Sequence, residues 1–298
     1  MEAREEISSL LMRQLTFRVG STERIAYQFP EKGSTGSQSA VIALHGAGGH
    51  PLIFRRMSRL DYALSGHASI IFLAAEKQSR LSRWSLDSES DYDFLLSVFD
   101  YLQSQDISTK NIHVVGMSNG GCLGHLFSST CGFQFGNLVT VCSAMPMQLG
   151  SHTQAAGSLT GPKSVFIANS MYDAIIPYKG GYLHSDIPYE VCSHKQTVDY
   201  WISRLRCNEL SVFSSPIYAE LQRAEASLFK YYISDADNKV LSLTSVSSSH
   251  CWSLISDACN HGGSKQRSIR RILPPPSRNN PDHLPLITQL TAKFISQK

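Results

Sequence analysis

A serine set among glycines is the residue whose surroundings in this sequence point most directly to chemistry. The stretch "GMSNGG", residues 116–121, follows the apolar run "NIHVV" and precedes a helical pattern. It matches Gly-x-Ser-x-Gly at a strand-to-helix corner, where a sharp turn projects a serine hydroxyl from the edge of a sheet. Glycines suit that corner because larger side chains would meet the adjacent strand and helix. The motif favours Ser118 as a nucleophile over the alternative of a purely structural turn.

A serine nucleophile needs a base, and the base needs an acid that orients it. In the chain order that accompanies this corner, an acidic residue and then a histidine each follow a later strand. Asp173 follows the apolar run "KSVFIANS", and His250 follows "KVLSLTSVSS". We therefore predict Asp173 as the acid and His250 as the base; the alternatives are a turn or cap residue and an ordinary loop histidine. Weaker candidates for these two roles are Asp186, Asp199, His184, His194, His261 and His283.

The glycine-rich loop "HGAGGH", residues 45–50, follows another apolar run and can supply backbone donors. Acyl transfer builds negative charge on a substrate oxygen, which two backbone amides can hold. We expect one donor to be the amide of Asn119, directly after the serine, and the other to be the amide of Ala47 in this loop. A phosphate-binding loop is the competing interpretation, but the Gly-Lys-Ser/Thr ending and the Gly-x-Gly-x-x-Gly spacing are both missing.

These residues must be positioned by an alternation of strands and helices. Apolar runs predict buried strands at residues 40–44, 68–76, 111–117, 137–145, 163–170 and 239–248. Between the second and third of them, residues 90–105 carry apolar side chains at helical spacing: Phe94, Leu95, Val98, Phe99 and Leu102. This alternation predicts an α/β fold with a mostly parallel sheet that is covered by helices on both faces.

The predicted domain organisation is one domain over residues 1–298. Residues 208–226 are expected to form an insertion near the cleft or simply a loop and a helix. Residues 262–285 are basic and then proline-rich, which predicts an irregular surface segment before a last helix at residues 286–296. The arginines of that segment lack interleaved aromatic residues, so a solvated loop is favoured over a nucleic-acid site.

Composition excludes several classes of function. The 298 residues carry 27 basic and 24 acidic side chains, a balance that does not suggest nucleic acid. The 11 histidines and seven cysteines show no metal-binding spacing. We expect Cys122, Cys131 and Cys142 to be free thiols in the core. A disulfide between Cys192 and Cys207, or one that involves Cys251 and Cys259, remains open.

No stretch approaches the roughly 18 apolar residues of a membrane span. The N-terminal segment "MEAREEISSLLMRQLTF" lacks the basic start and apolar stretch of a secretory signal. The sequence therefore favours a cytoplasmic location.

Four blocks, "LHGAGGH", "GMSNGG", "DAIIPYKGG" and "SHCW", resemble in this order one branch of the α/β-hydrolase superfamily. That branch contains polyhydroxybutyrate depolymerase-like and feruloyl esterase-like serine esterases. Residues 173–181 are similar to its Asp-x-x-[Val/Ile]-Pro-[Tyr/Phe]-x-Gly-Gly block, and residues 197–209 resemble its Trp-containing helix. The resemblance runs from Phe17 to Leu254. Around the histidine, "SSSHCWS" stands where the family has Gly-Gly-Gly-His-x-Trp-Pro.

The resemblance implies an α/β-hydrolase fold and a catalytic triad of Ser118, Asp173 and His250, with no cofactor and no metal. It also implies an oxyanion hole formed by the amides of Ala47 and Asn119.

In the family an aromatic residue near the position of Trp84 borders the cleft. Trp84 and Trp252 are therefore candidate substrate-lining residues, with ordinary packing as the alternative.

The predicted function is hydrolysis of carboxylic esters through an acyl-enzyme intermediate, with a small or oligomeric ester as substrate. A non-catalytic α/β-hydrolase-like binding protein and a serine peptidase on the same scaffold are the alternatives.

Overall fold

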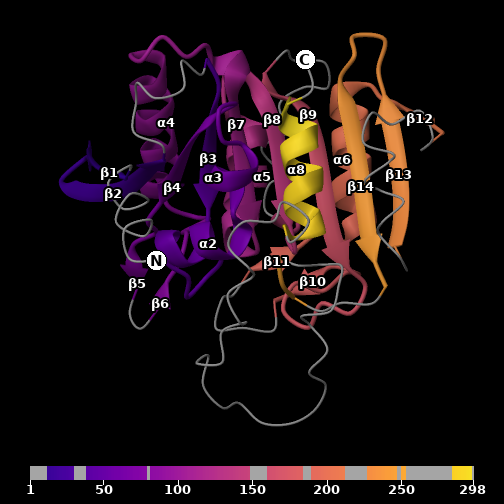
Figure 1. The fold of residues 1–298 in the computed structure, drawn as a ribbon. Helices are drawn as coiled ribbons and strands as arrows, with labels where there is room; N and C mark the ends of the chain where they lie inside the picture. The colour runs from indigo at the N-terminus through magenta and orange to yellow at the C-terminus, as the bar shows by residue number, and fades with distance from the viewer. Residues whose placement is uncertain are drawn as a thin grey trace.

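A large mixed sheet forms the centre of the molecule (Figure 1). The structure is a computed structural model, and it describes residues 12–29, 38–78, 81–147, 160–183, 189–211, 227–246, 250–252 and 284–296. In spatial order, the ten strands of the sheet are β1 (Arg13–Val19), β2 (Thr22–Phe29), β4 (Ser69–Leu73), β3 (Ala40–Leu44), β7 (Ile112–Met117), β8 (Gln134–Val141), β9 (Gly161–Ser170), β14 (Lys239–Ser245), β13 (Ser227–Ile233) and β12 (Asn208–Leu210).

The middle of this sheet, from β4 to β14, is parallel throughout. Its six strands correspond to the six apolar runs of the sequence. They read as continuous apolar runs because helices cover both of their faces. The expected α/β architecture is confirmed, with small differences in strand ends: β4 is shorter than the predicted strand at residues 68–76, and β8 begins earlier than residue 137.

Antiparallel strands extend the sheet at both edges, and the sequence analysis did not predict them. β1 and β2 form a hairpin that pairs with β4, and β13 and β12 follow β14 at the opposite edge. In β1 and β2, buried and exposed residues alternate, which is the pattern of strands with one solvent-facing side. Residues 208–210 of the predicted insertion form β12; residues 212–226 lie outside the described residues.

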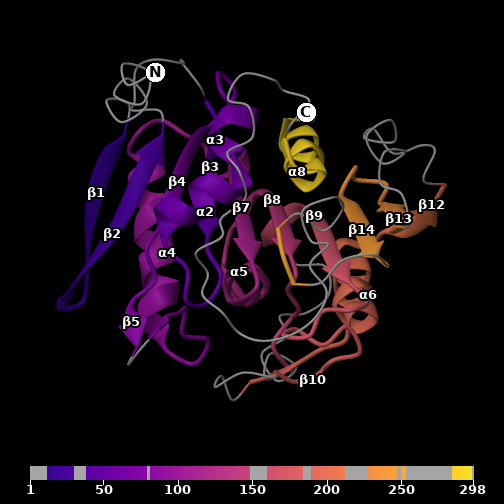
Figure 2. The same ribbon diagram turned by 60° about the horizontal axis from the view of Figure 1, so that its bottom comes forward.

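Helices pack on each face of the sheet. α4 (Glu89–Gln103), α5 (Asn119–Thr130) and α6 (His194–Leu205) contribute to one apolar core. The other core contains residues of α2 (Pro51–Ser58), α3 (Leu60–Ala63) and α8 (Leu286–Ser296). In Figure 2, α3 and α8 lie on one side of the strands and α5 and α6 on the other. The predicted apolar face at residues 90–105 is the buried face of α4, and the predicted last helix is α8.

Short elements complete the described part of the chain. They are η1 (Thr109–Asn111) and two ribbons, β5 (Lys77–Gln78) with β6 (Leu81–Ser82) and β10 (Gly181–Tyr182) with β11 (Glu190–Val191). The β10–β11 ribbon lies at the lower end of the sheet in Figure 1. Of the predicted irregular segment at residues 262–285, all but the last two residues lie outside the described residues.

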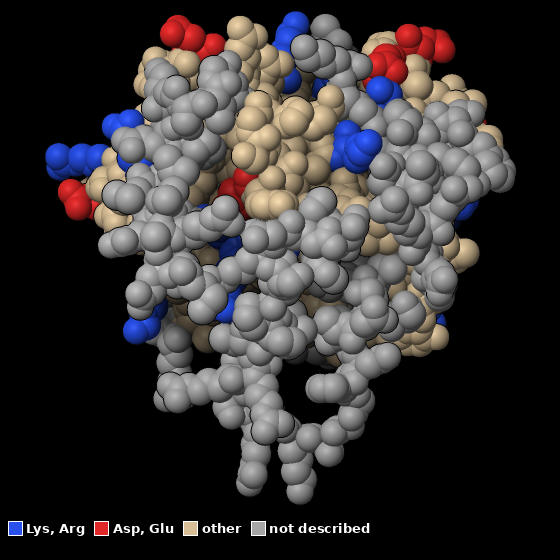
Figure 3. All heavy atoms as spheres, in the orientation of Figure 1, with Lys and Arg blue, Asp and Glu red and all other residues tan. Residues whose placement is uncertain are grey.

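The surface in Figure 3 shows basic and acidic atoms of the described residues in small separate groups around an uncharged area. Within the described ranges, no helix combines the length and the apolar character needed to cross a membrane.

The cysteines that the sequence assigned to the core are free and buried: Cys122, Cys131 and Cys142. Cys192 and Cys207 are also free thiols, so no disulfide joins them. A bond between Cys251 and Cys259 involves a position outside the described residues.

Three buried histidines are held by hydrogen bonds that suit the neutral ring. The Nδ1 atom of His113 accepts from the amide of Asn137 at 3.0 Å. His125 accepts at Nδ1 from the indole of Trp201 at 3.1 Å. His194 contacts the side-chain amide of Asn169 through Nδ1 and Ser242 through Nε2, at 3.1 and 2.9 Å. Burial lowers the pKa of these rings from 6.5 to about 4, about 3 and about 4, respectively.

We expect these rings to make the fold sensitive to acid. Their folded-state pKa values lie below the unfolded value, so at a pH below 6.5 the unfolded chain binds protons that the folded chain does not. Each ring then removes about 1.4 kcal/mol from the free energy of unfolding per pH unit, down to its folded pKa. Urea unfolding between about pH 7 and about pH 5 measures this slope.

Substitution separates the histidine contribution from other groups. His125→Gln should flatten the slope, because one of the three buried rings is then missing. Equal slopes for His125→Gln and the parent protein would contradict the assignment of this acid sensitivity to the buried rings.

Candidate active site

The turn at Ser118 joins β7 to α5 in a strained conformation. Ser118 has φ 53° and ψ −127°, outside the regions that residues with a side chain usually adopt. Its amide donates to the carbonyl of Val141 on β8 at 2.9 Å, and its carbonyl accepts from the amide of Cys122 at 3.0 Å. These two bonds hold the turn between the neighbouring strand and the first turn of the helix.

The glycines around Ser118 are required because backbone segments approach closely there. A Cβ atom at Gly116 would lie 2.6 Å from the carbonyl oxygen of Gly120. A Cβ atom at Gly120 would lie 2.5 Å from the carbonyl oxygens of both Leu44 and His45. Such contacts essentially never occur, so the nucleophile turn and the loop after β3 can meet only through glycine.

The structure brings the three predicted triad residues into one hydrogen-bonded chain. Nε2 of His250 lies 2.9 Å from Oγ of Ser118, and Nδ1 lies 2.9 and 2.8 Å from the two carboxylate oxygens of Asp173. A carboxylate only accepts, so Nδ1 carries the proton and Nε2 accepts from the serine hydroxyl. The side chains are 14% exposed for His250 and 2% for Asp173, and Ser118 is 7% exposed. The arrangement can therefore take a proton from Ser118.

The carboxylate of Asp173 is oriented by its own loop. The amides of Ile175 and Ile176 donate to its Oδ1 atom at 2.9 and 2.8 Å. Further along the loop, the ring of Tyr178 stacks on His194 with centroids 4.9 Å apart, and its hydroxyl lies 2.9 Å from Thr244 Oγ1. The loop is thus fastened to α6 and β14, which keeps the acid beneath the histidine.

The loop after β3 lies against Ser118. A Cβ atom at Gly46 would be 3.2 Å from Cβ of Ser118. The carbonyl of Gly46 accepts from Nδ1 of His45 at 2.7 Å and from the amide of Gly49 at 3.0 Å. Because C=O and N–H point in opposite directions across a trans peptide, the Ala47 amide faces away from these bonds.

Both predicted oxyanion donors have a free N–H. No group in the part of the chain that the structure describes accepts a hydrogen bond from the amide of Ala47 or of Asn119. The amide of Asn119 is also the first of α5, so it has no partner within the helix and lies at the positive end of the helix dipole. Asn119 directly follows Ser118, and Ala47 follows Gly46, which lies against Ser118, so both amides belong to segments next to the serine.

Comparison with known proteins addresses the fold. No protein-family model and no curated protein matches this sequence. An acetyl xylan esterase from Aspergillus awamori superposes with a TM-score of 0.57 at 12% identity, over 80% of this chain and 94% of its own. This chain has the α/β-hydrolase fold. A carboxylesterase from Mesorhizobium loti has a TM-score of 0.48 at 13% identity, over 83% of this chain and 93% of its own. A Bacillus cereus carboxylesterase has a TM-score of 0.45 at 16% identity, over 84% of this chain and 92% of its own.

The other predicted candidates for the acid and the base lie elsewhere in this α/β-hydrolase fold or outside the described residues. His194 is the buried ring under Tyr178, and Asp199 pairs with Lys195 on the surface of α6. The remaining candidates, Asp186, His184, His261 and His283, lie outside the described residues.

Neither Trp84 nor Trp252 lines the site, which corrects the prediction that they are substrate-lining residues. Both side chains are 0% exposed. Trp252 packs edge-on against Phe54 and donates from Nε1 to Thr288 on α8 at 2.9 Å. Trp84 packs beside His45 with ring centroids 5.2 Å apart. Both tryptophans therefore serve ordinary packing, which was the alternative in the sequence analysis: their rings fix the loops that follow the strands to the core.

Cys142 lies near Asp173 and His250, which the sequence analysis did not predict. Its sulfur, an Asp173 oxygen and a His250 nitrogen lie within 4.8 Å of one another, so the three could in principle hold a metal ion. However, burial raises the pKa of the Cys142 thiol well above its ordinary value, so the thiol keeps its proton. The thiol donates to the carbonyl of Cys251 at 3.3 Å. Cys142 therefore holds the backbone directly after His250 through this hydrogen bond.

The elbow makes a steric prediction. Gly120→Ala should lower the free energy of unfolding by about 1–3 kcal/mol and remove most reactivity at Ser118, because its Cβ atom would meet two backbone carbonyls at 2.5 Å. Gly132→Ala is the matched control, since a Cβ atom there meets nothing within 4 Å. Urea unfolding and labelling with a fluorophosphonate probe measure the two effects. Similar behaviour of the two variants would refute the steric account of the turn.

Proposed function

We propose that this protein is a serine hydrolase that cleaves carboxylic esters through an acyl-enzyme intermediate. The observation that carries the proposal is the continuous hydrogen-bonded chain from Ser118 through His250 to Asp173. Its supports are the strained turn at Ser118 and the amides of Ala47 and Asn119, from which no described group accepts a hydrogen bond. The fold alone does not determine function, so the proposal depends on this geometry.

The first half of the reaction follows from the positions of these groups. Oγ of Ser118 attacks the ester carbonyl carbon while its proton passes to Nε2 of His250, 2.9 Å away. The carbonyl oxygen becomes an oxyanion that accepts hydrogen bonds from the amides of Ala47 and Asn119. Asp173 holds the ring in the tautomer that can accept the proton and stabilises the imidazolium that results. The carbon–oxygen bond to the alcohol then breaks, and the alcohol leaves with the proton from His250.

The second half repeats these steps with water. His250 takes a proton from a water molecule, which attacks the carbonyl carbon of the acyl-enzyme. The same two amides hold the second oxyanion. When the bond to Oγ breaks, Ser118 regains its proton from His250 and the carboxylic acid departs. No cofactor or metal is needed for the proton and electron balance of either half.

We also propose the substrate branch that the sequence motifs suggest, a small or oligomeric ester of the kind cleaved by polyhydroxybutyrate depolymerase-like and feruloyl esterase-like proteins. The similarity in fold to an acetyl xylan esterase adds acetylated sugars to the candidates. A panel of p-nitrophenyl esters of increasing acyl length, methyl ferulate, 3-hydroxybutyrate oligomers and acetylated xylan distinguishes these classes by kcat/KM.

Ser118→Ala tests the nucleophile. We expect the variant to lose hydrolysis by on the order of 10⁴-fold or more, and to lose fluorophosphonate labelling completely, because no other described group takes the place of Oγ. Ser97→Ala, on the exposed side of α4, should retain both properties. Undiminished hydrolysis by Ser118→Ala would exclude the mechanism. A parent protein that neither labels nor hydrolyses any ester would favour a non-catalytic binding protein.

Asp173→Asn tests the role of the acid. The amides of Ile175 and Ile176 should hold the asparagine oxygen in the place of Oδ1, which leaves the side-chain NH₂ facing Nδ1 of His250. The ring would then carry its proton on Nε2 and could not accept from Ser118, so kcat should fall by on the order of 10⁴-fold. Asp199→Asn removes an exposed carboxylate of α6 and should leave kcat unchanged. Near-normal kcat in Asp173→Asn would show that Asp173 does not set the tautomer.

A further inference from the structure

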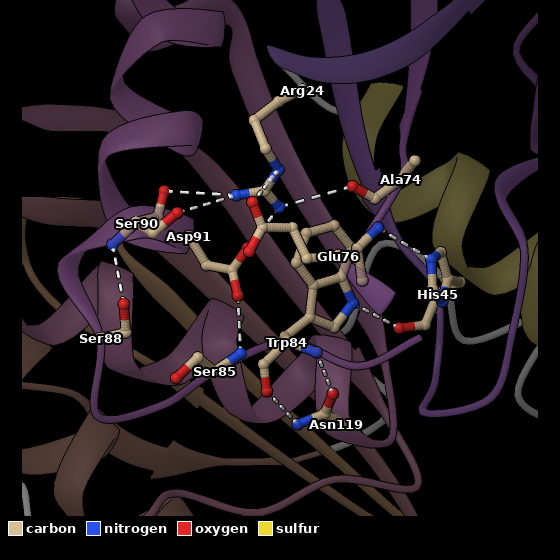
Figure 4. A network of polar contacts seen from close by, with 11 residues as sticks. Arg24, His45, Ala74, Glu76, Trp84, Ser85, Ser88, Ser90, Asp91 and Asn119 are labelled. Atoms are coloured by element: carbon tan, nitrogen blue, oxygen red, sulfur yellow. Dashed lines mark hydrogen bonds and ion pairs between the residues drawn. The ribbon is translucent and has the colours of Figure 1, made fainter. Parts of the chain in front are cut away.

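Trp84 connects the two segments that carry the proposed oxyanion donors. Its indole Nε1 donates to the carbonyl of His45 at 2.7 Å, at the start of the loop that contains Ala47. Its backbone amide donates to Oδ1 of Asn119 at 2.7 Å, and Nδ2 of Asn119 donates back to its carbonyl at 3.1 Å. Figure 4 shows Trp84 between His45 and Asn119. One residue therefore contacts both sides of the proposed oxyanion hole.

On the loop side, the hydrogen bond from Trp84 continues into a fixed chain of contacts. Nε2 of His45 accepts from the amide of Ala75 at 3.2 Å, so the ring proton lies on Nδ1 and is donated to the carbonyl of Gly46. That carbonyl sets the direction of the next N–H, which belongs to Ala47. Trp84 holds the carbonyl one peptide earlier, so a shift of the indole would turn the backbone that aims the Ala47 amide.

On the helix side, both polar groups of the Asn119 side chain are occupied by the backbone of Trp84. Asn119 is 3% exposed, so this side chain serves to hold the first residue of α5 and not to meet a substrate. A double hydrogen bond fixes both the position and the rotation of that residue. The backbone amide of Asn119 is thereby tied to the same residue that ties the loop.

Trp84 is itself anchored away from Ser118. The next amide, of Ser85, donates to Oδ2 of Asp91 on α4 at 2.6 Å, and the other carboxylate oxygen pairs with Arg24 of β2. The guanidinium of Arg24 lies over the ring of Phe94, 4.4 Å from its centroid. The side chains of this ion pair are 1% and 3% exposed. The segment around Trp84 is thus held in place by a hydrogen bond to Asp91, whose carboxylate is part of a buried ion pair.

We propose that Trp84 is a positioning residue that holds the amides of Ala47 and Asn119 at the separation required by the oxyanion. This inference rests on the proposed function. Donors aimed at a developing charge contribute most when they are fixed before the reaction, and small displacements reduce their effect. The neutral ester of the ground state needs these donors less than the tetrahedral state does. Loosening of the pair should therefore lower kcat while KM changes little.

Trp84→Phe tests the inference because it keeps a buried ring and removes the indole N–H. We expect kcat to fall by about 10- to 100-fold, with KM within about threefold of the parent value. Affinity for an alkyl boronic acid, which forms a tetrahedral anion on the serine, should fall by a similar factor. Trp201→Phe is the matched control: its side chain is also 0% exposed and its indole donates one hydrogen bond, to His125 at 3.1 Å. This control should keep kcat.

Asn119→Ala removes the two side-chain hydrogen bonds to the backbone of Trp84 and retains the backbone amide of residue 119. It should lower kcat in the same way, and the double variant Trp84→Phe/Asn119→Ala should lose less than the product of the two single losses, because both loosen one pair of donors. Circular dichroism and the urea midpoint show whether Trp84→Phe folds. If it does not, Asn119→Ala alone tests the positioning role.

The outcomes are distinct. A parent protein that hydrolyses esters, combined with equal kcat for Trp84→Phe and Trp201→Phe, or with normal kcat for Asn119→Ala, would overturn the positioning role and leave the proposed function intact. A rise in KM with unchanged kcat would also overturn it, because it would indicate a substrate contact. A parent protein that neither labels nor hydrolyses would overturn the proposed function and this inference with it.

Discussion

The close approach of three backbone segments at Ser118 is the constraint on which the rest of the site depends. The elbow, the first turn of α5 and the loop after β3 meet at distances that exclude a Cβ atom, with 2.5 Å between a Cβ atom at Gly120 and the carbonyl oxygens of Leu44 and His45. Because these backbones touch, the loop that carries Ala47 and the residue Asn119 both lie next to Ser118. The cost is a serine held at φ 53°, a strain that the surrounding packing must offset.

The parallel centre of the sheet explains how residues so far apart in sequence meet. β7, β8, β9 and β14 are neighbours in that order and run in the same direction. Ser118, Asp173 and His250 each follow the carboxyl end of one of these strands, so they share one edge of the sheet although 132 positions separate the first from the last. This is the edge at which open α/β sheets place their binding sites. The edge hairpins β1–β2 and β12–β13 widen the sheet without contributing a triad residue.

Around this edge, buried polar groups form hydrogen bonds and ion pairs with one another. His125, His194 and Asn169 connect α5, α6 and β9 beside the acid loop, and Arg24, Asp91 and Trp84 connect β2 and α4 to the oxyanion segments. Each such group stabilises the fold only while its partner is present, since an unpaired buried polar group is costly. These contacts hold the helices on the sheet, and those made by Arg24, Asp91 and Trp84 also limit the movement of the segments that carry Ala47 and Asn119.

Much of this could be predicted from the sequence, and the physical reasons are specific. The six central strands were predicted because burial on both faces makes each a continuous apolar run, and Ser118, Asp173 and His250 because strand exits are local features in a fixed order. The hairpins β1–β2 and β12–β13 were missed because strands with one exposed side carry a weaker signal. The sequence alone therefore determined the candidate serine, aspartate and histidine and their order along the chain. Only the tertiary structure decided that Trp84 is buried with hydrogen bonds to both His45 and Asn119, and that the sulfur of Cys142 lies within 4.8 Å of an Asp173 oxygen. Contacts between segments distant in the chain leave no periodic or local pattern in the sequence.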